Sequence, residues 1–567
     1  MKSFAGRAAS IPSRCVHRAA LATALFALVA LCGCVKTGTV SQTGSTGTQT
    51  SSTERKHPAH VLVYADGQNF DTLNPHLYQA TSLGNLSSLT MGWLVRYDHD
   101  NKPLPELVTE IPTIADGGVS KDGKRITWHV RHGVKWSDGA PFDADDVVFS
   151  TQAVLNPKNN EVGRDGWDLI TKIDEPDKYT VVYHMKKAYA PYLATFFSTA
   201  GANPCIIPKH ILGALPNINT APYNALPVGI GPFRYVAWKR GDSVIMEANP
   251  NYWRGTPKLK QIIYKQIPDR NTLLTQLQTG EIDMWSDVGA GYVPRVQGLA
   301  GHTTITPIGS YFGHLDFNVT HPPLDDVRVR RALRFALDRE TILKEAFHGG
   351  GVLQESMVSP VFPQYHKFDM VPTDDAQANA LLDQAGWTQR DKDGIRMKNG
   401  KRFSLDYAIY TGAADIDTMV ELIRSMWKAI GVAIEVKHYD TSLFFALMQS
   451  GGISYGGKFD VESFYWGGDP IGDNTSLYGC AFIPPNGQNV TRWCDKRFDD
   501  DMAHFKALLD PKARQPYLDD AIARVIDQVP TVVLYIRNDN YSFASGLTGF
   551  NPNALSPFDD FINVDIQ

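Results

Sequence analysis

Segments typical of β-strands and of α-helices alternate in the middle of the chain, and this alternation constrains the fold more than any other feature. Within residues 229–289 the strand-like runs Phe233–Trp238 and Ser243–Ala248 flank a turn and predict a hairpin. Asn271 is placed to cap a helix, and the strand-like run Ile282–Trp285 follows it. Strands and helices in this order predict an α/β layer architecture.

Two further helices carry clear signals at their first residues. Asp143 is placed as an N-cap, with Asp146 three residues later in the position of a capping-box partner. Apolar residues recur at helical spacing through Asp325–Asp338 and predict an amphipathic helix. We expect its four arginines to form a solvated or salt-bridged face and not an anion site. These are Arg328, Arg330, Arg331 and Arg334.

The N-terminal segment has the features of an export signal. An apolar run, Ala19–Leu31, follows four basic residues and is too short to span a bilayer permanently. It ends at Gly33-Cys34, which resembles a bacterial lipobox. We predict a signal peptide over residues 1–33 and lipidation of Cys34, although Cys32 departs from the usual pattern. An ordinary secretory signal with an incidental cysteine is the alternative.

A segment rich in Thr, Ser, Gly and Gln follows Cys34 and extends to His57. Such a segment cannot bury enough apolar surface to offset its chain entropy, so residues 34–57 are predicted to form a flexible linker. His57 and His60, at its edge, are expected to be solvated. An anchor followed by a tether indicates a globular body that works near a membrane outside the cytoplasm.

The charge balance narrows the classes of partner. The chain has 55 basic and 60 acidic residues and a formal net charge of −5. A nucleic-acid binder needs a basic surface, so we expect no nucleic-acid partner. An acidic body is not attracted to anionic lipid either, so only the lipid anchor would hold it at the membrane.

Two cysteines are placed to form a disulfide. Cys480 and Cys494 flank a turn-rich stretch, and export favours oxidation. Closing so short a loop is worth about 3 kcal/mol in the entropic description. Cys205 is predicted to be a small buried hydrophobic residue. The absence of a Cys-x-x-Cys pair gives no support to redox catalysis or a zinc ribbon.

Motifs of catalysis are absent from the sequence. It contains no His-Glu-x-x-His, no Gly-x-Ser-x-Gly and no phosphate-binding Gly-x-x-x-x-Gly-Lys. The histidines are scattered, and no carboxylate pair stands out. We therefore predict no catalytic residue, no metal ligand and no cofactor.

Five ordered blocks carry a family resemblance. The blocks are Val134–Gly139, Ala144–Ser150, Gly229–Tyr235 with Glu247–Trp253, Asp326–Leu333 and Leu381–Trp387. They resemble segments of the solute-binding proteins of peptide and nickel ABC importers, extracellular family 5, and the resemblance extends from about residue 58 to the C-terminus. The order of predicted helices and strands agrees with this resemblance.

The resemblance implies a two-lobed α/β fold of the periplasmic-binding-protein type (type II) with a hinge. Lobe 1 would comprise residues 58–313 with an extra subdomain at about 101–204, lobe 2 residues 314–530, and residues 531–567 would return to lobe 1. The two crossings are expected near Tyr311–Asn318 and Leu534–Asn538. Hinge closure between such lobes removes a ligand from water.

The segment Phe464–Pro470 resembles the family segment in which a carboxylate meets the α-ammonium of a bound peptide. The resemblance makes Asp469 the candidate for that carboxylate, with Trp466 as a wall. Gly468 would let a ligand backbone approach closely, and Tyr465 is also a candidate ligand-binding residue. A plain Asp-Pro turn is the structural alternative, and Asp473 is a competing anchor.

The resemblance predicts a lipid-anchored, monomeric receptor that captures short peptides and delivers them to an ABC permease. The same fold binding a nickel chelate, haem, opine or oligosaccharide is the alternative. An anchored extracellular hydrolase and a receptor for signalling or adhesion are more remote ones. The sequence leaves open the length and identity of the ligand, the permease and the type of membrane.

Overall fold

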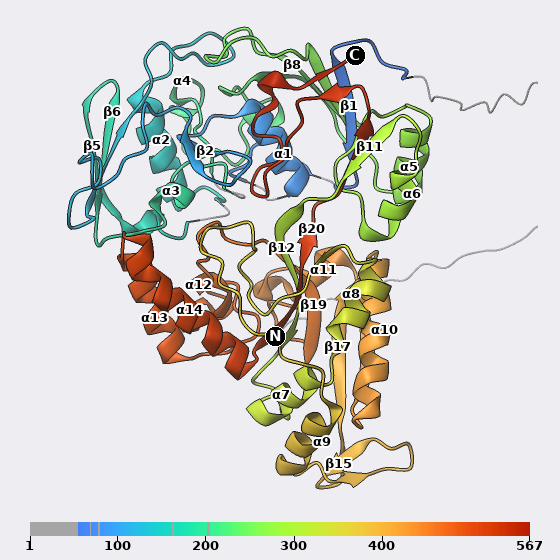
Figure 1. The fold of residues 1–567 in the computed structure, drawn as a ribbon. Coiled ribbons are helices and arrows are strands. Elements are labelled where there is room, and N and C mark those ends of the chain that lie inside the picture. The colour runs from blue at the N-terminus through green and yellow to red at the C-terminus, as the bar shows by residue number, and fades with distance from the viewer. Residues whose placement is uncertain (1–54, 69, 78–79, 162–163, 201–203) are drawn as a thin grey trace, which may run out of the picture. The chain divides into compact units, whose positions relative to one another are not determined.

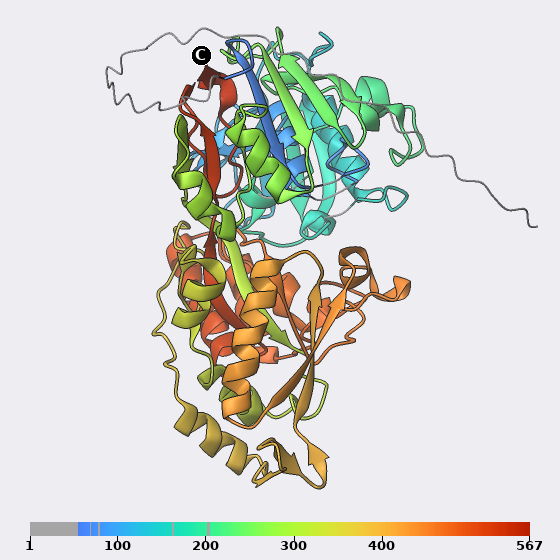
Figure 2. The ribbon, with the colours of Figure 1, turned by 90° about the vertical axis from the view of Figure 1, so that its right-hand side faces the viewer.

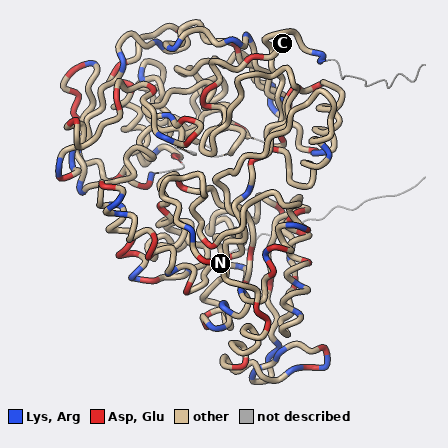
Figure 3. Tube along the Cα trace, in the orientation of Figure 1, with Lys and Arg blue, Asp and Glu red and all other residues tan. Residues whose placement is uncertain are grey.

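The computed structural model describes residues 55–567 except residues 69, 78–79, 162–163 and 201–203 (Figure 1). The predicted signal peptide, Cys34 and nearly all of the predicted linker therefore lie outside the described residues. Among the helices that are described, none is long and apolar enough to cross a membrane. Acidic and basic residues are interspersed along the described trace (Figure 3).

The first lobe contains a seven-stranded sheet. In pairing order its strands are β11 (His302–Ile305), β21 (Tyr541–Ala544), β10 (Met284–Trp285), β1 (Val61–Asp66), β9 (Gln261–Gln266), β8 (Ser243–Ala248) and β7 (Phe233–Lys239). β1 runs parallel to both of its neighbours, β9 and β10. Leu62 and Tyr64 join one apolar cluster and Val63 and Ala65 another, so β1 is buried on both faces, as parallel strands usually are.

The predicted β7–β8 hairpin is confirmed, whereas the predicted cap of the following helix is wrong. Helix α5 (Arg270–Gln278) is capped by Asp269, whose side chain accepts a hydrogen bond from the Thr272 amide at 2.7 Å. An aspartate at this position takes the capping role, and Asn271 lies inside the helix. A further helix of the first lobe, α6 (Val293–Gln297), contacts β11, and α1 (Thr81–Thr90) lies beside β7.

A separate three-stranded sheet lies within the predicted extra subdomain. Its strands are β4 (Arg125–His129), β6 (Thr180–Met185) and β5 (Ile170–Asp177). Helix α2 (Ala144–Leu155) packs on them, and the apolar residues of this unit form their own cluster. The capping box predicted for α2 is confirmed, since both the Asp143 and the Asp146 side chains accept backbone hydrogen bonds.

The second lobe contains a six-stranded sheet. In pairing order its strands are β13 (Gly351–Val352), β20 (Thr531–Asn538), β12 (Ile308–Phe317), β19 (Val461–Trp466), β17 (Ser404–Tyr410) and β18 (Ala433–Tyr439). Its principal helices are α7 (Val327–Phe335), α8 (Arg339–Phe347), α9 (Asp375–Gln384), α10 (Ala414–Ala429), α13 (Lys496–Ala507) and α14 (Pro511–Gln528). Figure 2 shows α10 lying along one face of the sheet, where Trp427 and Ile423 join the core. Apolar residues of α13 and α14 form a second cluster with Phe312 and Val533.

Smaller elements complete the two lobes. Short helices are α3 (Tyr192–Thr195), α4 (Lys209–Leu212), α11 (Thr441–Phe444) and α12 (Thr475–Tyr478). Short strands are β2 (Val95–Tyr97), β3 (Pro103–Pro105), β14 (Gln389–Arg390), β15 (Arg396–Lys398), β16 (Lys401–Arg402), β22 (Leu547–Thr548) and β23 (Asp565–Ile566).

The chain passes between the two sheets at positions a few residues away from the predicted ones. The first crossing lies between Ile305, the last residue of β11, and Ile308, the first residue of β12. The second lies between Asn538 at the end of β20 and Tyr541 at the start of β21. β12 and β20 are antiparallel partners, and the first residue of β12, Ile308, pairs with the last residue of β20, Asn538. Both crossings therefore leave the second sheet at the same end of these two strands (Figure 1). We propose sheet membership as the boundary between the lobes.

The residues at the end of the predicted linker are held against the first lobe. Arg55 Nε lies 2.8 Å and His57 Nδ1 3.2 Å from carboxylate oxygens of Asp283, whose side chain is 1% exposed. His60 Nδ1 lies 2.8 Å from Asp565. The expectation that both histidines are solvated is therefore wrong. A buried carboxylate needs a charged partner, and Arg55 supplies one to Asp283.

The arginine face of α7 agrees with the prediction only in part. Arg328 pairs with Asp326 at 2.6 Å, and Arg331 pairs with Asp527. Arg330, however, is 4% exposed and donates to the Gln528 carbonyl at 2.6 Å. It also donates to the Val529 carbonyl. Arg330 thus satisfies carbonyl groups left without partners at the end of α14, and the prediction of a solvated or salt-bridged face is wrong for it.

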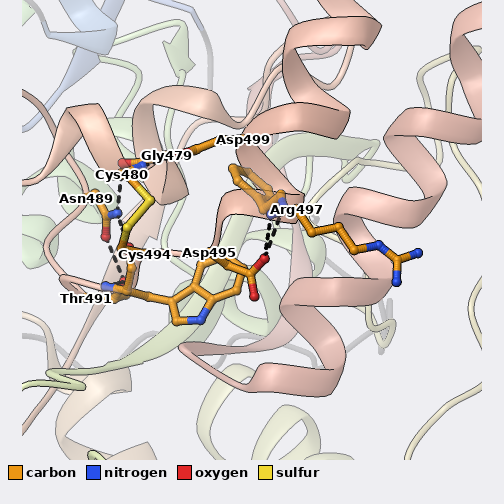
Figure 4. Close-up of a disulfide and its surroundings, with 10 residues drawn as sticks. Gly479, Cys480, Asn489, Thr491, Cys494, Asp495, Arg497 and Asp499 are labelled. Atoms are coloured by element: carbon orange, nitrogen blue, oxygen red, sulfur yellow. Dashed lines mark hydrogen bonds between the residues drawn. A yellow bond between two sulfur atoms is a disulfide. The ribbon is translucent and has the colours of Figure 1, made fainter.

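Cys480 and Cys494 are joined by a disulfide (Figure 4). Inside the loop that it closes, the Asn489 side chain donates to the Gly479 carbonyl at 3.0 Å. The Thr491 hydroxyl in turn donates to the Asn489 side chain at 2.8 Å. The loop therefore has polar connections of its own beside the bond. Cys205 is free and buried.

Candidate functional site

A cavity of about 720 Å³ is lined by residues of both lobes. It includes the ends of β1 and β10 and part of α1 on one side, and the loop after β19 on the other. All four predicted ligand-binding residues contribute to its lining, namely Tyr465, Trp466, Gly468 and Asp469. The competing anchor Asp473 lines it as well. The structure thus brings the predicted site residues together in one concave site.

Asp469 is held by backbone amides. Its Oδ1 accepts hydrogen bonds from the amides of Ile471 and Asp473, both at 2.9 Å. Among the described residues, no basic side chain lies within 4.0 Å of its carboxylate, and Arg514 acts on it only from a longer distance. Burial, followed by the nearby Asp473 carboxylate, raises the pKa of Asp469 to about 7. The carboxylate is therefore fixed in direction but lacks a positive charge in contact with it.

Asp473 has partners that Asp469 lacks. Its Oδ1 accepts from the Thr475 amide at 3.0 Å and from the Thr475 hydroxyl. Its Oδ2 lies 3.6 Å from Lys506 Nζ, and its side chain is 9% exposed. An aspartate that already pairs with a lysine is less suited to a second cation, so the geometry favours Asp469 as the anchor.

Gly468 is required by a close approach within the protein. A Cβ atom at this position would lie 2.5 Å from the Ser310 carbonyl oxygen, to which the Gly468 amide donates at 3.1 Å. The beginning of β12, directly after the first crossing, and the loop after β19 therefore meet at Gly468. The predicted approach of a ligand backbone at Gly468 stays a prediction.

The aromatic candidates are fixed by neighbouring rings. The Trp466 ring stacks on the His314 ring with centroids 6.4 Å apart and an angle of 7° between planes. The Tyr465 hydroxyl lies 2.7 Å from the Tyr535 hydroxyl. Strands β12, β19 and β20 supply these rings, so the wall of the cavity is built from the regular part of the second sheet.

Comparison with known proteins assigns the chain to a family. Residues 102–487 match the profile of the bacterial extracellular solute-binding proteins, family 5 Middle. The chain belongs to this family. The oligopeptide-binding protein AppA of Bacillus subtilis is 26% identical over 456 residues, which cover 79% of this chain and 81% of the relative.

Solved structures of this kind have the same fold. AppA from Bacillus subtilis in complex with a nonapeptide gives a TM-score of 0.77 at 23% identity, covering 89% of this chain and 99% of that chain. NikZ from Campylobacter jejuni in complex with Ni(L-His) gives 0.76 at 24% identity, with coverage of 89% and 98%. The predicted two-lobed α/β fold is confirmed.

A second charged group in this family 5 cavity has no signal in the sequence. Arg537, at the end of β20, lies 3.2 Å from Asp539 and 3.8 Å from Asp287. Its guanidinium also lies 5.0 Å from the Tyr311 ring centroid and 5.6 Å from that of Tyr465. Burial opposes the charge of Arg537, but the two carboxylates outweigh it and raise the pKa of Arg537. Asp287 is far in sequence from the other two, so only the topology brings the three charges together.

Asp66, the last residue of β1, is a further acidic residue of the cavity that the sequence analysis did not single out. It is 2% exposed and accepts from the Ser82 hydroxyl at 2.6 Å and the Tyr264 hydroxyl at 2.8 Å. Burial is the main cause that raises the pKa of Asp66, and Asp287 adds to it. Within the described residues, no group of three or more His, Cys, Asp or Glu side chains could hold a metal ion.

Proposed function

We propose that this chain is the extracytoplasmic, lipid-anchored receptor of an ABC importer, which captures short peptides between its lobes and delivers them to the permease. The observation that carries the proposal is the Asp469 carboxylate, which lines the cavity and accepts hydrogen bonds from backbone amides, while no basic side chain among the described residues lies within 4.0 Å of it. In this role the chain binds and releases its cargo and catalyses no reaction.

The α-ammonium group of a peptide fits the chemistry of Asp469. A buried carboxylate without a base is costly, and an ammonium group that reaches it forms a charge-assisted hydrogen bond. Asp473, with Lys506 beside it, would hold the local structure of the loop. Trp466 and Tyr465 would form the wall along the first peptide residues.

The size and position of the cavity support a short cargo. A volume of about 720 Å³ lies in the range of roughly 300–1,000 Å³ that is typical of small-ligand sites. The two crossings join the lobes at one edge, which is an arrangement suited to hinge closure over a ligand. The liganded form would then be recognised by the permease through its differential affinity for the closed state.

Calorimetry with the purified globular body tests the proposal. Di-, tri- and tetrapeptides with free N-termini are compared with the same peptides after N-acetylation, which removes the ammonium charge. We expect stoichiometric binding without cleavage, and a loss of roughly 10- to 100-fold in affinity after acetylation, since hydrogen bonds to charged groups contribute about 1.5–3 kcal/mol. Asp469→Asn keeps the oxygen that the backbone amides use and removes the charge.

Asp469→Asn should weaken the free peptides and leave the acetylated ones unchanged. Asp369→Asn is the matched control, because Asp369 is exposed and does not line the cavity. Equal affinity of the Asp469→Asn variant and the wild type for free peptides would refute the assignment of Asp469. Native mass spectrometry of freshly purified protein would reveal a nickel chelate, haem, opine or oligosaccharide if one of these is the cargo.

The anchor and the permease require tests in cells. Membrane fractionation of cells that express the full chain or Cys34→Ser, with mass spectrometry of the mature N-terminus, tests lipidation. Loss of peptide uptake in a deletion strain tests the dependence on a permease and distinguishes import from signalling or adhesion. A tether keeps the effective concentration of receptor high at the permease.

A further inference from the structure

The charged residues that line the cavity are mostly acidic. Among the described residues the lining contains five aspartates, while Arg537 is its one basic residue. The aspartates are Asp66, Asp287, Asp469, Asp473 and Asp539. The cavity wall therefore has an excess of negative charge before any cargo binds.

The partners of these aspartates show where the excess lies. Asp473 pairs with Lys506, and Asp287 and Asp539 share Arg537. Within the part of the chain that the structure describes, Asp66 accepts hydrogen bonds from uncharged donors alone, and Asp469 accepts them from backbone amides alone. Both Asp469 at one end of the cavity and the group Asp66, Asp287 and Asp539 at the other thus lack part of their counter-charge.

The topology of the first sheet explains the second acidic group. β1 and β10 are parallel neighbours, with Ala65 opposite Trp285. Asp66 follows at the end of β1, and Asp287 comes two residues after Trp285. Carboxyl ends of parallel strands are where α/β folds bind ligands. β21 pairs with β10 on the other side, which brings Asp539 to the same edge.

Asp287 is the member of this group that a ligand can reach. Its side chain is 40% exposed, and its ion pair with Arg537 is long, at 3.8 Å. Asp539 is 15% exposed and lies closer to Arg537, at 3.2 Å. Arg537 is therefore already compensated by two carboxylates and stacked near two tyrosines, which makes it a poor receptor for a carboxylate of the cargo.

We propose that the cavity selects cationic cargo, namely short peptides with a basic side chain. The α-ammonium group binds Asp469, and the second positive charge lies at Asp287 with Asp66 behind it. This selectivity rests on the proposed function, because it takes peptides as the cargo and Asp469 as the anchor. An acidic side chain in the same place meets uncompensated carboxylates, and a neutral one leaves Asp287 without a new partner.

Calorimetry with three tripeptides tests this selectivity. Ala-Lys-Ala, Ala-Ala-Ala and Ala-Glu-Ala share length and termini and differ in the charge of one side chain. A second set, Ala-Ala-Lys, Ala-Ala-Ala and Ala-Ala-Glu, covers a different distance from the ammonium group. In at least one set we expect the lysine peptide to bind about 10-fold more tightly than the alanine peptide, as for one charge-assisted contact. The glutamate peptide should bind most weakly.

Asp287→Asn should reduce the preference for lysine over alanine to less than about threefold. Asp369→Asn, at an exposed position outside the cavity, should keep the full preference. The preference should also shrink in about 0.5 M NaCl, since salt screens an exposed pair.

The outcomes separate this inference from the proposed function. If all peptides bind with equal affinity, or if the glutamate peptide binds best, the cationic selectivity is wrong while peptide capture stands. If none of the peptides binds and a different solute co-purifies, the proposed function itself is wrong. A lysine preference that survives in Asp287→Asn would overturn the placement of the second charge.

Discussion

The two ends of the cavity treat negative charge differently. At the end formed by the first sheet and the second crossing, Arg537 lies between Asp287 and Asp539, so part of the charge is balanced within the protein. At the end formed by the loop after β19, Asp469 has backbone amides as its nearest polar partners. The first end is a partly balanced ion-pair network in which Asp287 stays open to the cavity, and the second has no basic side chain in contact with its carboxylate.

Buried carboxylates away from the cavity sharpen this contrast. Asp283 in the first lobe is 1% exposed and pairs with Arg55. Glu355 in the second lobe is 3% exposed and pairs with Arg339. At both positions the fold supplies a base to a carboxylate that it buries.

Glu462 on β19 is buried, and among the described residues no basic side chain lies within 4.0 Å of its carboxylate. It accepts from the Ser454 hydroxyl at 2.9 Å, and burial, followed by the Asp316 carboxylate, raises the pKa of Glu462 well above its ordinary value. Glu462 does not line the cavity, so no cargo reaches it there. Asp469 therefore differs from these residues in combining access from the cavity with the lack of a base in contact.

The largest effect is expected from Arg537→Met. It fills a similar volume but leaves Asp287 and Asp539 beside each other without a base. Because removing one partner of a largely buried pair leaves an uncompensated charge, we expect a loss of about 3 kcal/mol in the free energy of unfolding. Urea denaturation measures it. Arg537→Lys, which keeps the charge, should lose less; equal losses would mean that packing on Tyr311 and Tyr465 matters more than charge.

Gly468→Ala should follow in size. The added Cβ would lie 2.5 Å from the Ser310 carbonyl oxygen, so the loop after β19 and the beginning of β12 would have to separate. Overpacking of this kind costs about 1–3 kcal/mol and should also displace Asp469. The temperature of thermal unfolding and the affinity for peptides should both decrease. Gly298→Ala is the control, since nothing lies within 4 Å of the Cβ position there.

Local signals in the sequence predicted local structure well. The capping box of Asp143 and Asp146 involves residues three apart and is confirmed. The β7–β8 hairpin and the helix that begins after Asp326 likewise follow from short stretches. The family resemblance, which depends on five ordered blocks, predicted the two-lobed fold and gathered Tyr465, Trp466, Gly468 and Asp469 at one cavity.

Features that depend on distant partners escaped prediction. Arg330 looked like one of four surface arginines, but its carbonyl acceptor at Gln528 is 198 residues away. Arg55 binds Asp283, 228 residues away, which pins the end of the predicted linker. Arg537 and Asp287 meet because β21, which follows the second crossing, pairs with β10. No local pattern carries this information, since the contacts depend on how the sheets close.

The affinity for peptides should depend on pH through Asp469. Its pKa is raised to about 7 in the ligand-free protein, and an ammonium group binds the ionised form. As the pH falls below about 7, Asp469 takes up a proton, so we expect peptide affinity to fall by up to about tenfold per pH unit down to about pH 5. Calorimetry at each pH measures this. Asp469→Asn should abolish the dependence, and a slope that survives in this variant would assign it to another group.

Stability in the absence of ligand should separate Asp469 from its neighbour Asp473. The pKa of Asp469 rises from 3.8 to about 7 on folding, so the wild type loses stability as the pH rises from about 4 to 7 and regains none above it. Asp469→Asn has no such loss and should therefore be more stable than the wild type at about pH 8, with no gain at about pH 4. Thermal unfolding at the two pH values measures both.

Asp473→Asn should shift stability in the opposite direction at the higher pH, because it removes the partner of Lys506 while keeping an oxygen for the Thr475 amide. Two aspartates on one loop, given the same substitution, would thus respond with opposite signs. That result would follow because Asp473 has a base, Lys506, whereas Asp469 gains a positive charge only when the cargo binds. Destabilisation by both substitutions would instead place Asp469 among the structural carboxylates and remove the main reason to regard it as the anchor.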